Sequence, residues 1–430
     1  MTRLLILCEY FPPENKIGAV RPARLAKYLA KRQDIEVSVV CAKPHGLACA
    51  EEEIMYGSVR VLRISKGKLA GLLHRKSTNG PVRMNGKSAV GKDRISKRMK
   101  KRLVSGAIAV RDYMERETLY HGAIRKISTA EYDVIFSTFN TDFGHRTAKW
   151  YKTRHPSVKW IADFRDPTWS VDMTEERKTA AKEFAADVAR CCDVITVVSP
   201  GIVEAHKSEF LDKRCCVVYN GYDPDDRVGM TQTDNDGVFR LVYTGELYNG
   251  RRDLRPVFCA LSRLAEHGKV DLSKIEVVYA GKSGNVFEEQ VAQFDAIKYC
   301  NKGFISHQAA MNLQDRAQIL LLASWCSRDE KYTLTGKFFE YLSADKPIVC
   351  VISGDEKGSA LSTAINEHGL GVCYEEANDQ TDFDRLCAYL EEQYCGFMTK
   401  KACMFEPDLE YIKRFSYEKI AEQVYDIISE

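Results

Sequence analysis

Short apolar runs and longer helical patterns alternate along the whole chain, and this alternation constrains the fold more than any other feature of the sequence. In the helix expected over Ala19–Arg32, Leu25, Tyr28 and Leu29 share one face, and Pro22 falls near the start, where proline is tolerated. Alternation of this kind builds parallel sheets covered by helices on both faces. The strands expected in the first half are Leu4–Leu7, Glu36–Cys41, Val59–Ile64, Asp133–Ser137, Val158–Asp163, Asp193–Val198 and Cys216–Tyr219, with a second helix over Glu175–Arg190.

The pattern restarts at Phe239, after a turn-rich stretch that reads YNGYDPDDRVGMTQTDNDG over 219–237. We therefore expect an α/β protein with two Rossmann-like domains facing each other across a cleft. The expected parts are an N-terminal domain over 1–218 with a basic segment at 60–126, a linker over 219–238, a second domain over 239–405, and a helical segment over 406–430 that packs on either domain. The expected elements of the second domain are a strand at 239–245, helices Arg255–His267 and Asn285–Phe294, a strand at 275–281, strand Ala317–Leu322, helix Lys337–Ala344, strand Pro347–Ile352 and a last helix Tyr417–Ile428.

Composition places the chain among soluble globular proteins, since 45% of its 430 residues are hydrophobic and 29% are charged. No apolar run approaches the roughly 20 residues that span a bilayer, and the N-terminus lacks the pattern of a secretion signal. The 15 cysteines are scattered and include no CxxC pair, so we expect reduced thiols in a cytosolic protein.

Three loops that precede expected helices carry glycine and positive charge, which suits a phosphate group at a helix N-terminus. The first, EYFPPENKIGAVRPARLAKYLA over 9–30, contains Gly18, Arg21 and Arg24. A glycine there lets the backbone approach a ligand closely. The alternative is a surface turn with solvated arginines, because a single glycine is weak evidence.

The second loop opens the run TLTGKFFEYLSADKPIVC at 333–350. Thr335 and Gly336 lie where the helix begins, so its first N–H groups and Lys337 are placed to meet a diphosphate. Glu340 lies on the same side one turn later, where a carboxylate can accept hydrogen bonds from a ribose diol. The alternative is that Glu340 is a capping or surface residue.

The third loop, YTGELYNGRRDLRP over 243–256, follows the first strand of the second domain. It carries Gly245, Gly250 and the pair Arg251 and Arg252. A guanidinium suits a diphosphate because it offers several donors in a fixed fork. A solvated turn is the alternative for both arginines.

Together these stretches resemble a bacterial glycosyltransferase of family 4, which has the GT-B fold. The resemblance covers nearly the whole chain, and no single motif in it is strong. The motifs, in the family's order, are FPPE with GAVRPARLAKYLAKR, IADFRDPTW, VVSPGI, VVYNGYD, YTGELYNGRRD and GKFFEYLSADKPIV.

The resemblance implies a retaining transferase that moves a sugar from a nucleotide diphosphate donor to an acceptor hydroxyl, with the donor mainly on the C-terminal domain. It implies that Glu340 binds ribose, that Gly336 and Lys337 cradle the diphosphate, and that Arg251 or Arg252 stabilises the departing diphosphate. It further implies that Gly18 lies beneath the phosphates and that the backbone at Gly303, Phe304 and Ile305 faces the base. Guanidinium groups and helix N-termini can stabilise the leaving charge without a metal, so we expect no metal site and no cofactor.

The sequence departs from the family pattern at two positions. Many members have two glutamates spaced by seven residues, but Tyr332 stands eight residues before Glu340; Asp329 and Glu330 are nearby substitutes. The usual Gly-Arg after the first strand of the second domain is Gly245-Glu246 here, which leaves the cationic role to Arg251 and Arg252. A DxD match at Asp223 and Asp225 lies in the linker, where we expect a turn.

IADFRDPTW at 161–169 ends a strand with Asp163, Arg165 and Asp166. Asp163 is a candidate for orienting a donor or acceptor hydroxyl and Arg165 for binding phosphate, with an internal Arg–Asp salt bridge as the alternative. His145 is a further candidate for the acceptor side or the cleft, together with Arg21 and Asp166, although a lone histidine at a helix start is more often structural. None of them is assigned as a catalytic base.

Net charge is only +3, yet 19 Lys and Arg and four acids lie between Arg60 and Lys126. Within this basic segment, the stretch 92–110 reads KDRISKRMKKRLVSGAIAV. It places Ile95, Met99 and Leu103 at helical spacing among seven Lys and Arg from Lys92 to Arg102. This pattern predicts a basic amphipathic helix on an anionic membrane surface through 92–104. A solvated arm or a nucleic-acid contact is the alternative, and the lack of interleaved aromatic residues argues against specific single-strand binding.

These observations predict a glycosyltransferase of cell-surface polysaccharide or glycolipid biosynthesis, cytoplasmic or peripheral on the inner face of the membrane. Its partners are a nucleotide sugar and a glycan or lipid-linked acceptor, with no nucleic acid. Two alternatives remain: a GT-B nucleotide-sugar epimerase, and a catalytically silent nucleotide-sugar-binding protein.

Overall fold

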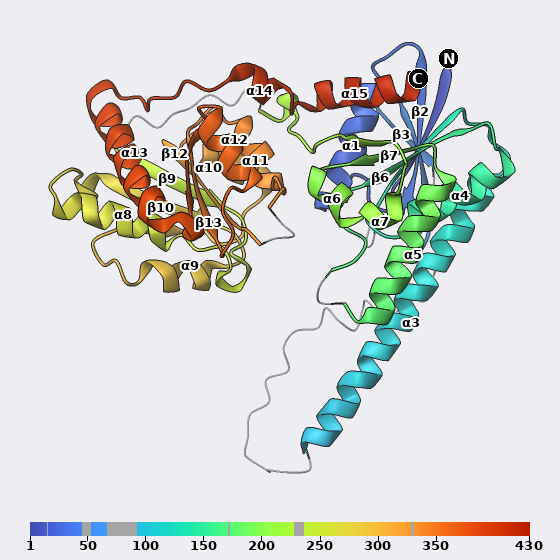
Figure 1. The fold of residues 1–430 in the computed structure, drawn as a ribbon, viewed down its shortest axis with the longest axis horizontal. Coiled ribbons are helices and arrows are strands. Elements are labelled where there is room, and N and C mark those ends of the chain that lie inside the picture. The colour runs from blue at the N-terminus through green and yellow to red at the C-terminus, as the bar shows by residue number, and fades with distance from the viewer. Residues whose placement is uncertain (15, 45–52, 67–92, 171–172, 228–235, 328–330) are drawn as a thin grey trace. The chain divides into compact units, whose positions relative to one another are not determined.

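The computed structural model covers residues 1–430. It describes all of them except 15, 45–52, 67–92, 171–172, 228–235 and 328–330, and except the side chains of 53–54, 93–107 and 109. The chain divides into two compact units (Figure 1). The N-terminal unit comprises Met1–Val198, His206–Val217 and Val424–Glu430, and the C-terminal unit comprises Ser199–Ala205 and Val218–Gln423.

An eight-stranded sheet forms the centre of the N-terminal unit, in the order β3-β4-β2-β1-β5-β6-β7-β8. β3 pairs antiparallel with β4, and the other pairings are parallel. The middle strands are continuous apolar runs, as in β1, where Leu4 to Leu7 are fully buried. The strands are β1 (Thr2–Leu7), β2 (Ile35–Ala42), β3 (Glu53–Tyr56), β4 (Val59–Ile64), β5 (Val134–Thr138), β6 (Lys159–Phe164), β7 (Val194–Val197) and β8 (Cys215–Val217).

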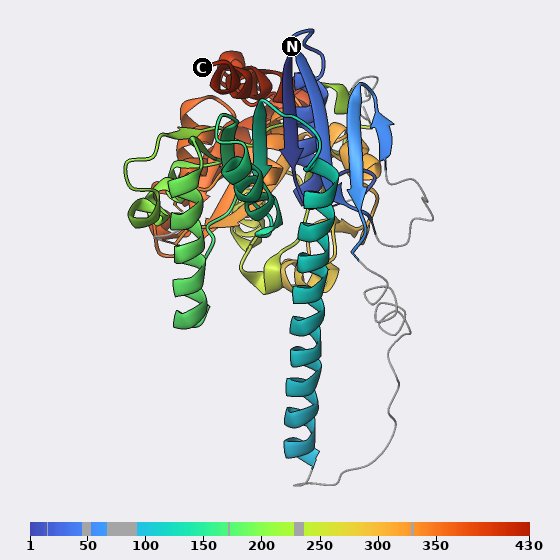
Figure 2. The ribbon, with the colours of Figure 1, turned by 90° about the vertical axis from the view of Figure 1, so that its right-hand side faces the viewer.

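Helices of very different length cover this sheet. The longest, α3, has 35 residues and runs well past the edge of the sheet (Figure 2). The end of the chain completes the unit: the Tyr425 hydroxyl donates to Asp34, and the Arg32 guanidinium lies 3.3 Å from the centre of the Tyr425 ring. The helices are α1 (Ile17–Leu29), α3 (Asp93–Ile127), α4 (Phe143–Arg154), α5 (Glu175–Cys191), α7 (Lys207–Phe210) and the last part of α15 (Tyr417–Ser429).

The C-terminal unit holds a six-stranded parallel sheet in the order β11-β10-β9-β12-β13-β14. Numbered along the chain this is 3-2-1-4-5-6, the strand order of the Rossmann fold. Its strands are β9 (Phe239–Thr244), β10 (Ile275–Ala280), β11 (Lys298–Asn301), β12 (Ile319–Trp325), β13 (Ile348–Ser353) and β14 (Gly371–Glu375). Its helices are α6 (Pro200–Ala205), α8 (Arg255–Glu266), α9 (Gly284–Val291), α10 (His307–Asp315), α11 (Gly336–Leu342), α12 (Ala360–Glu367), α13 (Asp379–Lys400), α14 (Leu409–Lys413) and the first part of α15.

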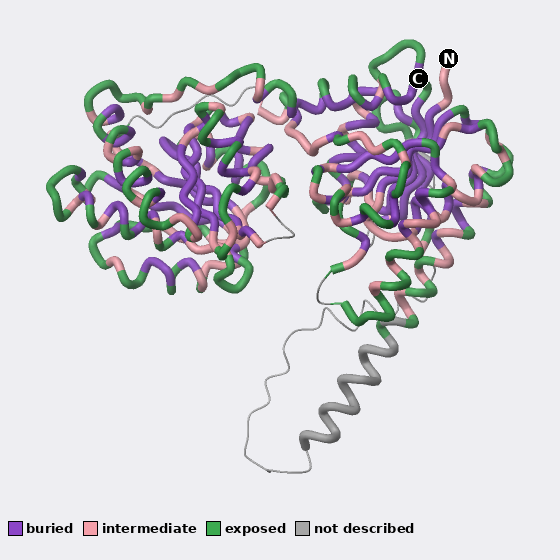
Figure 3. The backbone as a smooth tube through the Cα atoms, viewed as in Figure 1, coloured by how far each residue is buried: buried purple, intermediate pink, exposed green. Residues whose placement is uncertain are grey.

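Alternate residues of these strands enter two separate hydrophobic clusters, one on each face of the sheet. Leu241 of β9 and Leu321 of β12 lie in the first cluster, and their neighbours Val242 and Leu320 lie in the second. Figure 3 shows this buried core running through the middle of the unit. Because both faces are covered, polar groups are left for the strand ends, and a ligand site is expected there.

Candidate functional site

The strand order of the C-terminal sheet reverses between β9 and β12, and open α/β sheets bind ligands at the carboxyl ends of the strands beside such a reversal. Two predicted segments, the loop after β9 and the start of α11, lie at this edge together with the end of β12.

The loop after β9 is held close to the sheet by buried tyrosines. Gly245 has a positive φ of 155°, and its carbonyl accepts a 2.9 Å hydrogen bond from the Tyr279 hydroxyl. A Cβ added at Gly281 would lie 2.0 Å from the same carbonyl oxygen, so the backbone approach here requires glycine. The Tyr243 hydroxyl donates to the carbonyl of Glu246 at 2.9 Å. The loop therefore has a fixed shape before any ligand arrives.

Arg251 and Arg252 both lie against the ring of Trp325, the last residue of β12. Their guanidinium carbons are 4.5 Å and 5.3 Å from the ring centre, and Arg252 is also 4.5 Å from the Tyr248 ring. Tyr248 and Asn249 both have positive φ, at 45° and 54°. Residues with such strained backbone conformations occur more often at functional sites. Sequence reasoning left open which arginine points inward: Arg252 is half-buried, and Arg251 is exposed.

Two buried nitrogen atoms of this cluster have no hydrogen-bond acceptor among the described residues. The Nε of Arg252 and the Nε1 of Trp325 are buried nitrogen atoms without a hydrogen-bond partner among the described residues. The Nη1 of Arg252 donates to the carbonyl of Glu246 at 3.1 Å, and the other N–H groups of the guanidinium can donate to other acceptors. Buried donors without partners are costly, so this corner of the sheet is suited to an oxygen-rich ligand.

Helix α11 begins at this edge with a capped first turn. The Thr335 hydroxyl accepts a 3.3 Å hydrogen bond from the backbone N–H of Phe338, so the N-cap is Thr335 and not Glu340. Lys337 and Glu340 pair with each other, with 2.8 Å between Nζ and Oε1, and both side chains keep part of their surface exposed. Gly336 is exposed at the helix start. Lys337 and Glu340 thus contact each other, and their phosphate and ribose contacts stay predictions.

Burial raises the pKa of Glu340, but the charge of Lys337, its hydrogen bond, the amide of Gln314 and the charge of His307 more than offset this, and the pKa lies below its usual 4.5. Gln314, fully buried at the end of α10, donates to Glu340 and, at 2.8 Å, to the hydroxyl of Thr244 at the end of β9. Glu340 therefore stays ionised at neutral pH. Through Gln314 it is linked by hydrogen bonds to β9, the strand at which the strand order reverses.

The predicted segment at Gly303–Ile305 lies at the same edge, after β11. Gly303 has a φ of +64° and its carbonyl accepts from the N–H of Gly281 at 2.9 Å. Phe304 is 72% exposed, and the Lys282 ammonium lies 5.1 Å from its ring centre. An aromatic ring with so little packing around it offers a flat surface on which a ring can stack.

At the corresponding edge of the N-terminal sheet, Gly18 lies in the first turn of α1. A Cβ on it would come within 2.2 Å of the Asn140 side-chain nitrogen and 2.8 Å of the Tyr10 ring. Arg165 donates to the Gly18 carbonyl at 2.9 Å, so it anchors the start of α1. A side chain at position 18 would therefore force the Asn140 amide and the Tyr10 ring to shift, and the expected place of Gly18 beneath phosphates stays a prediction.

Arg21 and Asp163 form a buried ion pair. Arg21 is 1% exposed and donates from Nε at 3.1 Å and from Nη2 at 2.8 Å to the fully buried Asp163 carboxylate. The hydroxyls of Thr138 and Thr196 each donate to the same carboxylate at 2.8 Å. An internal Arg–Asp bridge was the alternative for this loop, and it forms with Arg21 in place of Arg165. With no exposed surface, Asp163 supports the strand ends through these bonds, and its role in orienting a hydroxyl stays a prediction.

His145 is likewise fully buried, among Phe139, Phe164 and Phe184. Its Nδ1 is 2.7 Å from the Ser137 hydroxyl, and burial lowers its pKa to about 3. A neutral ring without exposed surface fits the structural alternative for His145, and its role on the acceptor side stays a prediction. Asp166, by contrast, is exposed.

Sequence reasoning missed Trp325, Gln314 and Glu9. Trp325 and Glu9 each end or follow an apolar strand, and that position was a usable signal. Glu9 accepts a 2.8 Å hydrogen bond from Lys66, both side chains being about nine-tenths buried, and its Oε2 has no hydrogen-bond partner in the described part of the chain. Gln314 gave no signal, because its importance arises only from contacts between distant segments.

The DxD match forms a turn, as predicted. The N–H of Asp225 donates to Asp223 at 3.0 Å, and Pro224 opens a short 3-10 helix that runs to Arg227. Within the described residues, no group of three or more His, Cys, Asp or Glu side chains could hold a metal ion. In the same residues, no helix has both the length and the apolar character needed to cross a bilayer. Asp329 and Glu330, the candidate substitutes for the missing glutamate, lie outside the described residues.

No protein-family model and no curated protein sequence matches the chain. Solved structures do match it over its whole length. The UDP-forming α,α-trehalose-phosphate synthase of Burkholderia vietnamiensis has a TM-score of 0.61 at 11% identity, covering 100% of this chain and 99% of its own. The N-terminal domain of the Candida albicans trehalose-6-phosphate phosphatase has a TM-score of 0.60 at 8% identity, with 100% and 96% covered. The E. coli trehalose-6-phosphate protein solved with UDP-2-fluoro glucose has a TM-score of 0.58 at 11% identity, with 99% of each chain covered.

At identities this low the likeness concerns the fold. The predicted fold class, α/β with two Rossmann-like domains of the GT-B type, is confirmed.

Proposed function

We propose that this protein is a glycosyltransferase that moves a sugar from a nucleoside diphosphate sugar to an acceptor hydroxyl with retention of configuration and without a metal ion. In this proposal the C-terminal domain, 239–405, binds the donor and the N-terminal domain, 1–218, binds the acceptor, as in the family 4 enzymes that the sequence resembles. The structural neighbours support the proposal, since they include UDP-forming synthases and an enzyme studied for glycosyl transfer with retention.

One observation carries the proposal: the residues of the C-terminal unit that were predicted for a donor lie along one connected edge of its sheet. Burial raises the pKa of the Tyr243 and Tyr341 phenols, and the positive charge of Arg252 lowers the pKa of both in part. Tyr341 accepts from the N–H of Thr244 at 3.2 Å, and Thr244 is linked through Gln314 to Glu340 and Lys337. Guanidinium, ammonium and carboxylate groups are thus held together at a strand-order reversal.

Each group has a role in this proposal. The Arg252 fork and the first N–H groups of α11 stabilise negative charge on the departing diphosphate, because fixed donors in a site of low dielectric need no reorganisation. Arg251 and Lys337 add positive charge, and Lys337 leaves Glu340 for phosphate when the donor binds. Glu340 then accepts hydrogen bonds from the ribose hydroxyls. Gly245 and Gly303–Ile305 supply backbone to the sugar and base.

The test is a donor panel. The purified protein is incubated with UDP-, GDP-, ADP- and dTDP-sugars, and binding, slow donor hydrolysis and transfer to added acceptors are measured. Binding with slow hydrolysis or transfer supports the proposal. Epimerised sugar identifies the protein as an epimerase, and tight binding without turnover identifies it as a silent binder. Absence of binding to any nucleotide sugar overturns the proposal.

We also propose that the enzyme acts at an anionic membrane surface, on a glycan or lipid-linked acceptor of cell-surface polysaccharide or glycolipid synthesis. Helix α3 contains residues 93–126 of the basic segment, and the side chains of 93–107 lie outside the described ones. Farther along α3, apolar side chains are exposed: Ile108, Val110, Tyr113 and Met114 are 44–64% exposed. Basic residues near such a surface contribute about 1 kcal/mol each.

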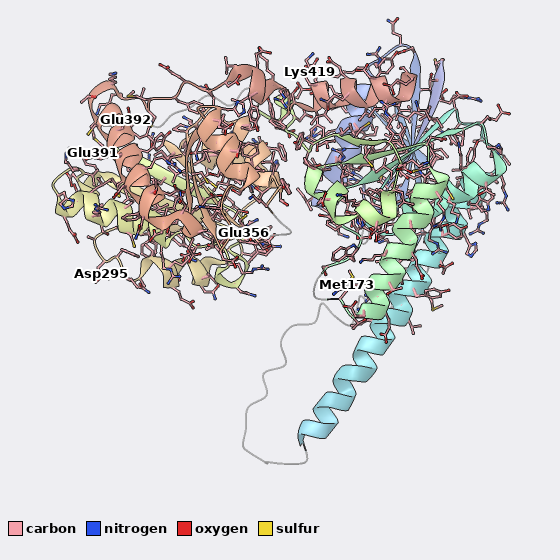
Figure 4. The ribbon with its side chains drawn as sticks, viewed as in Figure 1. Met173, Asp295, Glu356, Glu391, Glu392 and Lys419 are labelled. Atoms are coloured by element: carbon pink, nitrogen blue, oxygen red, sulfur yellow. The ribbon has the colours of Figure 1, made fainter. Side chains whose placement is uncertain are left out.

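Flotation with liposomes tests the membrane proposal. Vesicles containing anionic lipid should carry the protein upward, and neutral vesicles should not. Replacing Lys97, Arg98, Lys100 and Lys101 by glutamine should abolish flotation, while replacing Lys419, which pairs with Glu422 in the C-terminal unit (Figure 4), should not. Equal flotation of the fourfold variant contradicts the proposal.

A further inference from the structure

The amide of Gln314 connects three separate segments of the C-terminal unit. Gln314 lies near the end of α10 and is 0% exposed. Its amide contacts Arg227 in the 3-10 turn, Thr244 at the end of β9 and Glu340 in the second turn of α11. Its Nε2 is 2.8 Å from the Thr244 hydroxyl oxygen and 2.5 Å from the Oε1 of Glu340. A buried amide with all its directions used is fixed in one orientation.

Arg227 determines which way this amide points. Its guanidinium has only donors, so the atom of Gln314 facing it must be the carbonyl oxygen. Arg227 is itself fixed, because it also donates to Ser343 at 2.8 Å and to Asp315. The NH₂ group of Gln314 therefore has to face Thr244 and Glu340, and the opposite orientation would set the amide oxygen against the carboxylate.

This orientation gives the two carboxylate oxygens of Glu340 different surroundings. Within the described residues, the hydrogen bonds from Gln314 and from Lys337 both end on Oε1. Oε2 is left for an incoming donor group. A carboxylate held in this way by a neighbouring group has its rotamer set before the ligand arrives.

We propose that Gln314 is a positioning residue, which orients the carboxylate of Glu340 toward the ribose hydroxyls of the nucleotide and keeps it ionised when Lys337 turns to phosphate. The inference rests on the proposed function, because it requires Glu340 to be the ribose contact. The other charged or titratable groups near the pair are Lys337 and Tyr341 on α11, His307 and Asp315 on α10, and Arg227.

The first test variant is Gln314→Met, which keeps the length of the side chain and removes its donor. Nucleoside diphosphate dissociation constants are measured by calorimetry with UDP, GDP and ADP between pH 5 and pH 8. We expect about tenfold weaker binding than wild type at pH 8. We also expect a further loss toward pH 5, because a buried carboxylate that has lost a donor is protonated more easily. Each loss is taken relative to wild type at the same pH, because the terminal phosphate of a nucleoside diphosphate itself titrates in this range.

The second variant, Gln314→Glu, should show the opposite pH dependence. At pH 8 two carboxylates face each other and binding is weak, whereas at pH 5 a shared proton lets residue 314 donate to Glu340 as the amide does. Binding should therefore improve as the pH falls. A merely structural role for Gln314 predicts the same pH dependence in both variants. The matched control is Gln308→Met, an exposed glutamine on the same helix, which should bind as wild type does.

The outcomes separate the two proposals. If wild type binds a nucleotide and Gln314→Met binds it equally well at every pH, the positioning role is wrong and the proposed function stands. If wild type binds none of the nucleotides, the proposed function fails and this inference fails with it. Opposite pH dependence in the two variants, with an unchanged Gln308→Met control, supports the inference.

Discussion

The two sheets place charged residues at the same kind of edge but use them differently. At the N-terminal sheet, Arg21 and Asp163 neutralise each other out of contact with solvent, and His145 is enclosed by aromatic rings. At the C-terminal sheet, Lys337 and Glu340 are partly exposed, and Arg252 and Trp325 keep buried donors without partners in the described residues. Charged residues near strand ends can therefore be enclosed and fully paired, or partly exposed with donors to spare. We expect the first kind to be structural and the second kind to bind a ligand.

The largest effect should follow Asp163→Ala. It leaves the Arg21 guanidinium buried without its counter-charge, which costs about 3–5 kcal/mol of unfolding free energy. Urea denaturation measures it, with Asp166→Ala, at an exposed position, as the control that should change little. A fully stable Asp163→Ala protein that has lost transfer activity would break the comparison, because it would place Asp163 among the substrate-binding groups.

Arg252→Ala should be next in size and should act on turnover. Removing one fixed donor from a leaving-group site lowers the rate by about 10²–10³-fold. Arg251→Ala should cost less, since Arg251 is exposed and its guanidinium lies against the Trp325 ring at the surface. Donor hydrolysis rates measure both, with Arg263→Ala, which removes an exposed ion pair with Asp384, as the control. Equal rates in Arg252→Ala and Arg263→Ala would remove Arg252 from the site.

Glu340→Ala should weaken donor binding more than acceptor binding. Lost hydrogen bonds between a carboxylate and ribose correspond to about 1.5–3 kcal/mol. Calorimetric titration with the nucleotide that binds wild type measures this, and Glu392→Ala on α13 (Figure 4) is the control on an exposed surface. An unchanged donor dissociation constant would leave Glu340 as a partner of Lys337 alone.

The smallest effect concerns pH and His145. Burial lowers its pKa from 6.5 to about 3, so between these values the unfolded chain binds a proton that the folded chain does not. Stability is complete above pH 6.5 and falls as the pH drops, by at most about 1.4 kcal/mol per pH unit from this group. His145→Asn should flatten the pH dependence of unfolding free energy between pH 6 and 4.

His206, whose pKa burial also lowers, is present in both proteins and cancels in the difference. His121→Asn, which replaces an exposed histidine on α3, is the control variant for this measurement. An unchanged slope in His145→Asn would mean that the ring is not excluded from water as the structure describes.

The fold could be predicted from the sequence because strand and helix periods are local properties. Helix α5 begins at Glu175, as predicted, and β9 runs over the predicted run from Phe239. The prediction failed where a strand was short and polar: β11, which reads KYCN, was not expected. The 22-residue helix α13 was also missed, because its apolar residues are spread among many polar ones.

The candidate site could be predicted only in part. Lys337 and Glu340 were placed together because they share one helix face. The pairing of Arg21 with Asp163 joins residues 142 positions apart, and no local pattern contains it. Gln314 is the clearest case: its role depends on Arg227, Thr244 and Glu340 meeting around it, and each belongs to a different segment.

The last seven residues of the chain belong to the unit that is synthesised first. Arg214 pairs with Glu430, and Lys159 donates to the carbonyl of Ile427, so the N-terminal unit acquires these contacts only after residues 424–430 have been synthesised. Until then this unit is incomplete, although most of its residues precede those of the C-terminal unit. Removal of residues 424–430 would therefore leave its defect in the N-terminal unit, far from the deletion along the sequence.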